Sequence, residues 1–138
     1  MIPLGRHLAD LLLYRERLQV QQRVIDHITE AMIEEATRGN DNDIAVLLNN
    51  QGYTWNTLGE ARRAIEYYEQ ALAIDRQVWG DTHPDVARDY NNLGLAWNDL
   101  GEARQAKTYL EKALEIFMAV YGSDHPSTRT VKKNLETL

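Results

Sequence analysis

The sequence predicts an all-α protein in which antiparallel helix pairs stack into a superhelix. Three observations support this prediction. A 42-residue segment occurs twice in tandem, each copy contains two stretches with helical periodicity, and glycine or proline stands at the same places in both copies. Because one helix pair cannot cover its own apolar face, we expect consecutive pairs to pack against each other.

The repeat is evident from a gapless alignment of residues 43–84 with 85–126, in which 22 of 42 positions are identical. Both copies contain the motif Asn-Asn-x-Gly-x-x-Trp-Asn-x-Leu-Gly-Glu-Ala-Arg-x-Ala. A third copy begins after Pro126 and continues through Asn134 and Leu135. We therefore divide the chain into four segments. These are an N-terminal helical segment (1–42), a first repeat (43–84), a second repeat (85–126) and a truncated third repeat that caps the stack (127–138).

Within each repeat we expect two helices, over 43–58 and 61–78 in the first copy and over 85–100 and 103–120 in the second. A glycine follows each helix, as is typical of helix ends; these are Gly59, Gly80, Gly101 and Gly122. The prolines of the two His-Pro pairs, at 84 and 126, fall in the first turn of the next helix, where proline is tolerated.

Small and large residues recur inside the helices. Gly52 and Gly94 are expected to allow close approach of neighbouring backbones, and Trp55 and Trp97 to fill the remaining space in the core. Gln51 stands where the second copy has a leucine, which makes the first helix less apolar than its counterpart.

Composition excludes several classes of function. The chain has 138 residues, no cysteine, 43% hydrophobic residues and a net charge of −6. Disulfides and thiolate chemistry are thus excluded, and the acidic balance argues against nucleic-acid binding. No apolar stretch approaches the roughly 20 residues that span a bilayer, so we expect a cytoplasmic protein without membrane contact. The last twelve residues carry a charge of +2.

No constellation typical of an active site is present. His83 and His125 recur one repeat apart, each before a proline, which favours a structural role at the corner between repeats. Motifs for zinc, phosphate or serine nucleophiles are absent from the sequence. We therefore expect no enzymatic activity, no cofactor and no metal.

With these motifs the chain resembles the tetratricopeptide repeat (TPR) family, and in particular the 42-residue variant of kinesin light chains. The resemblance rests on Gly-Glu-Ala-Arg-x-Ala at the turn, Tyr-x-Glu-x-Ala-Leu in the second helix and Gly-x-x-His-Pro between units, and it covers residues 43–138. It implies an α-solenoid that acts as a scaffold or adaptor and binds a protein or peptide in a concave groove. The groove would be lined by first-helix residues, namely Asn49, Asn50, Tyr53, Asn56, Asn91, Asn92, Leu95, Asn98, Asp99, Thr130, Lys133 and Asn134.

Two alternatives stay open. One asparagine of each pair could bond a neighbouring helix and fix the stacking instead of contacting a partner. The N-terminal segment is either one long amphipathic helix or a diverged helix pair that packs on the first repeat. Its apolar positions fall close to a heptad pattern; they are Leu4, Leu11, Tyr14, Leu18, Ile25, Ile28 and Met32. The alternative function is therefore that of a self-assembling structural protein, a homodimer formed through this N-terminal helix or through exposed repeat ends.

Overall fold

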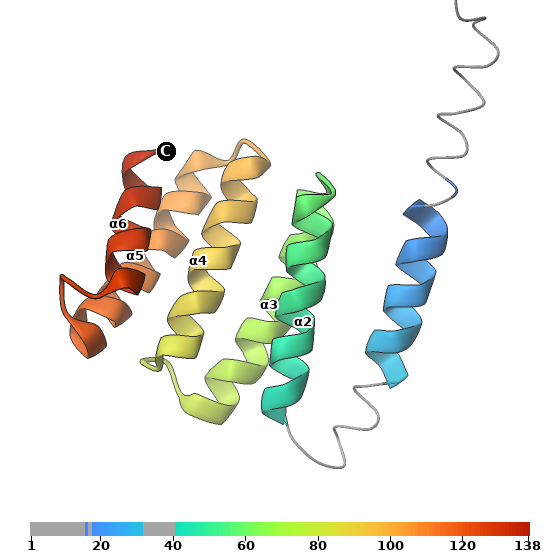
Figure 1. Cartoon of the computed structure of the whole chain (residues 1–138), viewed down its shortest axis with the longest axis horizontal. Helices are drawn as coiled ribbons and strands as arrows, with labels where there is room; N and C mark the ends of the chain where they lie inside the picture. The colour runs from blue at the N-terminus through green and yellow to red at the C-terminus, as the bar shows by residue number, and fades with distance from the viewer. Residues whose placement is uncertain (1–15, 17, 32–40) are drawn as a thin grey trace, which may run out of the picture. The chain divides into compact units, whose positions relative to one another are not determined.

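A computed structural model describes residues 16, 18–31 and 41–138 of the chain. The chain divides into two units, Met1–Arg38 and Gly39–Leu138. The described part of the second unit contains α2 (Asp41–Thr57), α3 (Ala61–Trp79), α4 (Pro84–Asp99), α5 (Ala103–Tyr121) and α6 (Pro126–Glu136) (Figure 1). No strand occurs in the described residues, and the all-α prediction is confirmed. The predicted helix boundaries differ from the observed ones by at most two residues.

In the first unit, residues 18–31 are helical. Val20, Val24 and Ile28 are spaced four residues apart and are exposed, whereas Leu18 and Ile25 are half-buried. Leu4, Leu11, Tyr14 and Met32 lie outside the described residues, so the choice between one long helix and a helix pair stays a prediction.

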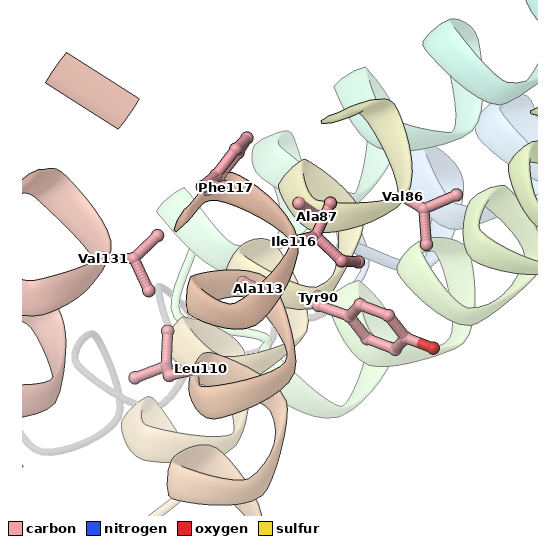
Figure 2. Close-up of a cluster of buried hydrophobic side chains, with 8 residues drawn as sticks. All are labelled: Val86, Ala87, Tyr90, Leu110, Ala113, Ile116, Phe117 and Val131. Atoms are coloured by element: carbon pink, nitrogen blue, oxygen red, sulfur yellow. The ribbon is translucent and has the colours of Figure 1, made fainter. Parts of the chain in front are cut away.

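The second unit is a sequential stack of helices. Helix α2 packs on α3, α3 on α4, α4 on α5, and α5 on α6. The core between the second and third repeats shows how this stacking buries apolar area. It joins Val86, Ala87 and Tyr90 of α4 to Leu110, Ala113, Ile116 and Phe117 of α5 and to Val131 of α6 (Figure 2). Three successive helices thus share one core, as the stacking argument requires.

The expected roles of the glycines are confirmed. Gly59 and Gly101 have φ of +82° and +89°, a region that favours glycine, and each ends the first helix of a repeat. Gly52 allows the ring of Tyr68 to approach, because a Cβ at this position would lie 2.6 Å from Tyr68 Cε1. Gly94 does the same for Leu110 in the next repeat.

The tryptophans are not equivalent. Trp55 is fully buried, as predicted, whereas Trp97 is only partly buried. The expectation that both fill the core is therefore correct for Trp55 and too strong for Trp97.

Candidate protein-interaction surface

The first helices of successive repeats are joined by side-chain amides. Asn92 Nδ2 donates to Asn49 Oδ1 at 3.4 Å, which links α4 to α2. One repeat later, Asn134 Nδ2 donates to Asn91 Oδ1 at 3.0 Å, which links α6 to α4. We call these two bonds the amide ladder. It shows that asparagines of the predicted groove set do bond neighbouring helices, which is the role left open as the alternative to partner contact.

A further bond joins α2 to α4, from Asn56 Nδ2 to Asp99 Oδ2 at 3.0 Å. Near the other end of α2, Asn49 is 8% exposed and donates through Nδ2 to Asp89 Oδ1 at 2.7 Å. Asn49 therefore uses its amide inside the stack, and little of its surface is left for a partner.

A hollow of about 210 Å³ lies where α2 and α4 meet. Its lining combines amides, aromatic rings, an aliphatic side chain and a guanidinium group, from Val46, Asn49, Asn50, Tyr53, Tyr68, Arg88 and Asn92. Tyr53 is 69% exposed and Val46 is 43% exposed, so apolar surface borders the hollow. Four residues of the predicted groove set meet here, and the sequence did not indicate Val46, Tyr68 or Arg88.

Tyr68 is contributed by α3 and is buried. Burial, together with the nearby Tyr53 and Asp99, raises the pKa of its hydroxyl to about 12. Like an ordinary tyrosine hydroxyl, it is protonated near neutral pH and can donate a hydrogen bond. The corresponding residue of the next repeat is Leu110, so only the first repeat offers this polar group.

The other members of the predicted set are spread along the first helices. Asn50 and Asp99 are exposed, and Asn98 and Leu95 are half-buried. In the third repeat, Thr130 and Lys133 are exposed and Asn134 is half-buried. A second hollow, of about 480 Å³, lies at this end and is lined by Ser123, Asp124, Arg129, Lys132, Lys133 and Glu136.

The corners between repeats use histidine as predicted. His83 Nδ1 accepts from the backbone N–H of Asp85 at 3.1 Å, and His125 Nδ1 accepts from that of Ser127 at the same distance. Each imidazole caps the N-terminus of a helix that begins with proline. Each also stacks on an aromatic ring: the ring centroids of His83 and Trp79 are 4.5 Å apart, and those of His125 and Tyr121 are 3.9 Å apart. In the part of the chain that the structure describes, no cluster of acidic or histidine side chains has the composition of a metal site.

An unexpected feature is a buried acidic pair between the first two repeats. Asp75 on α3 and Asp89 on α4 are both fully buried. Arg88 approaches them at 3.6 Å and 3.8 Å. Burial, followed by the neighbouring carboxyl group of Asp75, raises the pKa of Asp89 to about 8. The signal in the sequence was a substitution between repeats, because Phe117 stands where the first copy has Asp75.

Comparisons with known proteins agree with this architecture. Two family models described as tetratricopeptide repeat match residues 43–106 and 86–127, which together cover more than half of the chain. The chain therefore belongs to the tetratricopeptide repeat family. A search of curated proteins returned no match.

Similar solved structures include BtubC (BKLC) from P. vanneervenii, with a TM-score of 0.71 and 24% identity over 94% of this chain. A second structure, from Podosopora anserina, is described as kinesin light chain TPR-like repeats that are nearly identical to one another. It gives a TM-score of 0.67 and 20% identity over 99% of this chain. This chain spans 51% of the first structure and 67% of the second. At these identities the likeness shows the fold.

Members of this family generally mediate protein–protein interactions and are generally not enzymes. None of the helices in residues 18–31 and 41–138 is long and apolar enough to cross a bilayer.

Proposed function

We propose that this protein is a non-enzymatic interaction module that binds an extended peptide or a partner helix along the surface of α2, α4 and α6. The observation that carries the proposal is the hollow between α2 and α4, at which Tyr53 is 69% exposed. An exposed aromatic ring beside amides and a guanidinium group is typical of protein-binding surfaces, where aromatic residues and arginine supply much of the binding energy.

The polar groups at the hollow suit a polypeptide backbone. The exposed amide of Asn50 offers donors and an acceptor, which matches the alternating groups of an extended chain. Asn92 already donates to Asn49 and adds its carbonyl oxygen as an acceptor. The Tyr68 hydroxyl, which lines the hollow, adds a donor. Few charges line the hollow, so binding should weaken only modestly with salt.

At the other end, Arg129, Lys132 and Lys133 border the larger hollow. We infer that this end favours acidic residues of the partner, because three cations there face two acidic side chains, Asp124 and Glu136. A bound segment would then run from Tyr53 toward the basic end of α6.

Selection of peptides from a random display library against the whole protein tests this function. We expect Tyr53→Ala to weaken the selected peptides at least about tenfold, the effect of losing a central aromatic contact. The matched control is Glu111→Gln on α5, an exposed residue away from the hollow, which should leave affinity unchanged. Equal affinity of wild type and the Tyr53 variant for every selected peptide would refute the assignment.

Self-assembly is a second candidate function, favoured by the exposed row of Val20, Val24 and Ile28. An apolar row with four-residue spacing on a helix is suited to pairing with another helix. We expect Val24→Asp to convert any oligomer to monomer, as measured by light scattering at dilute and concentrated protein. A wild-type protein that is monomeric at all concentrations would exclude this candidate.

A further inference from the structure

The interface between the first and second repeats contains two carboxyl groups where the next interface contains two apolar side chains. Asp75 and Asp89 are both fully buried. The residues 42 positions later are Phe117 and Val131, which belong to the buried apolar cluster of Figure 2. Two equivalent positions in the stack therefore carry carboxyl side chains in one interface and apolar side chains in the other.

The hydrogen-bonding groups around the acidic pair include too few donors for two ionised carboxylates. An ionised carboxylate is only an acceptor. Asn49 donates to Oδ1 of Asp89. Oδ2 of Asp89 and both oxygens of Asp75 have no donor among the described residues. A proton on either carboxyl group supplies a donor, which lets the two groups bond to each other and removes the cost of two ionised acids side by side.

The charged groups around the pair balance only part of the negative charge. Arg88, from α4, reaches both carboxyl groups, but its side chain is 43% exposed and is also 3.8 Å from Asp85. Helix α2 contributes Asn49, which is neutral. One guanidinium group shared among three carboxyl groups compensates about one charge, so a second ionised acid in the buried pair is left without a counter-ion.

We propose that Asp75 and Asp89 share a single proton in the native protein, and that this proton holds the first and second repeats together. When the proton is lost, two carboxylates face each other between α3 and α4, and the interface loosens. Asn49 transmits the change to the amide ladder, because it bonds both Asp89 and Asn92. This contact between the first and second repeats does not depend on any partner, and it lies beside the surface proposed above for binding.

The direction of the pH effect follows from linkage. The pKa of Asp89 is about 8 in the native protein, against 3.8 for an unperturbed aspartate. Between these values the native protein holds a proton that the unfolded chain has released, so stability is greatest at the acidic end and falls as pH rises. The unfolding equilibrium constant should increase by up to about tenfold per pH unit across this range.

Urea unfolding of the whole protein at about pH 5 and about pH 8 tests the proposal. For wild type we expect the unfolding constant to rise at least about 100-fold between the two conditions. Asp89→Asn supplies a permanent donor to Asp75, so its unfolding constant should change less than about threefold. Glu66→Gln, on the exposed face of α3, is the matched control and should follow wild type. A flat wild-type profile, or an Asp89→Asn profile as steep as wild type, would overturn the proposal.

An NMR measurement on the wild-type protein keeps the test independent of how the variant folds. The side-chain amide signals of Asn49 should shift with a midpoint at about pH 8. Those of Asn91, which occupies the same position beside the apolar interface, should not shift over this range. Shared movement of both amides, or no movement of Asn49, would contradict a proton held by this pair.

Discussion

Gly94 marks the place where α4 and α5 leave no room for a side chain. A Cβ at this position would lie 2.6 Å from Leu110 Cγ and 3.2 Å from the carbonyl oxygen of Ala106. Leu110 is fully buried and Cγ is its branch point, so a rotamer change cannot relieve both contacts. Overpacking costs about 1–3 kcal/mol, and alanine gains about 1 kcal/mol over glycine in a helix. Because one contact is with backbone, we expect Gly94→Ala to destabilise the protein by about 1–2 kcal/mol.

Whether Gly94→Ala lowers or raises the free energy of unfolding tests this expectation. Urea unfolding followed by tryptophan fluorescence measures the change in stability. The control, Thr108→Ala on an exposed face of α5, gains helix propensity but loses the hydrogen bond from Thr108 Oγ1 to the carbonyl oxygen of Arg104, so it should stabilise the protein by at most about 0.5 kcal/mol. The double variant Gly94→Ala/Leu110→Ala removes the contacts with the Leu110 side chain and keeps the 3.2 Å contact with the Ala106 carbonyl oxygen. Its cost should therefore be less than the sum of the single costs by about 1 kcal/mol. Stabilisation by Gly94→Ala, or simple additivity with Leu110→Ala, would refute the close-packing argument.

The remaining predictions concern the core, the corner and the amide ladder. Trp55→Ala should cost about 3–5 kcal/mol, and Trp97→Ala clearly less, since Trp97 is only partly buried; equal losses in urea unfolding would contradict this difference. His125→Ala removes a helix cap and a ring stack, so we expect a loss of about 1–2 kcal/mol, and a melting temperature equal to that of wild type would exclude the capping role. Asn134→Ala should cost about 0.5–1.5 kcal/mol, because it breaks the hydrogen bond to Asn91 of α4. The control, Glu111→Gln at an exposed position, should change stability by less than about 0.5 kcal/mol. If the two variants were equally stable, the amide ladder would not stabilise the stack.

The helices and their order were predictable because a tandem repeat supplies two copies of each signal. Gly59 and Gly101 end equivalent helices with positive φ, and either one alone would have been weak support for a helix boundary. His83 and His125 were assigned to the corners on the same ground, and the structure confirms matching caps.

The candidate surface was harder to predict, since periodicity identifies a face of a helix and not what lies opposite it. Asn49 and Tyr53 fall on one stripe of α2, yet Asn49 is 8% exposed and Tyr53 is 69% exposed. The difference in exposure between these two residues depends on how closely α4 packs on α2, and no local sequence pattern encodes that distance. Tyr68 and Arg88 come from other helices and reach the hollow only through tertiary packing.

The acidic pair was detectable in principle. Asp75 lies four residues after the buried Ala71, so it falls on the stripe that faces the core, and its equivalent in the second repeat is Phe117. An ionisable residue on a core stripe violates the binary pattern, and such violations are expected at strained or functional positions. The exchange of aspartate for phenylalanine between equivalent core stripes is visible in the amino-acid sequence alone.

The two interfaces of this stack therefore differ in chemistry while sharing one geometry. The same amide bond crosses both, from Asn92 to Asn49 and from Asn134 to Asn91. Only the first of these bonds involves an asparagine that also contacts an acid, Asp89. If the proton on that pair is released, the position of α2 relative to α4 should change, while the position of α6 relative to α4 is retained. A peptide bound at Tyr53 would then dissociate more readily above about pH 8, and one bound only at the basic end of α6 would not.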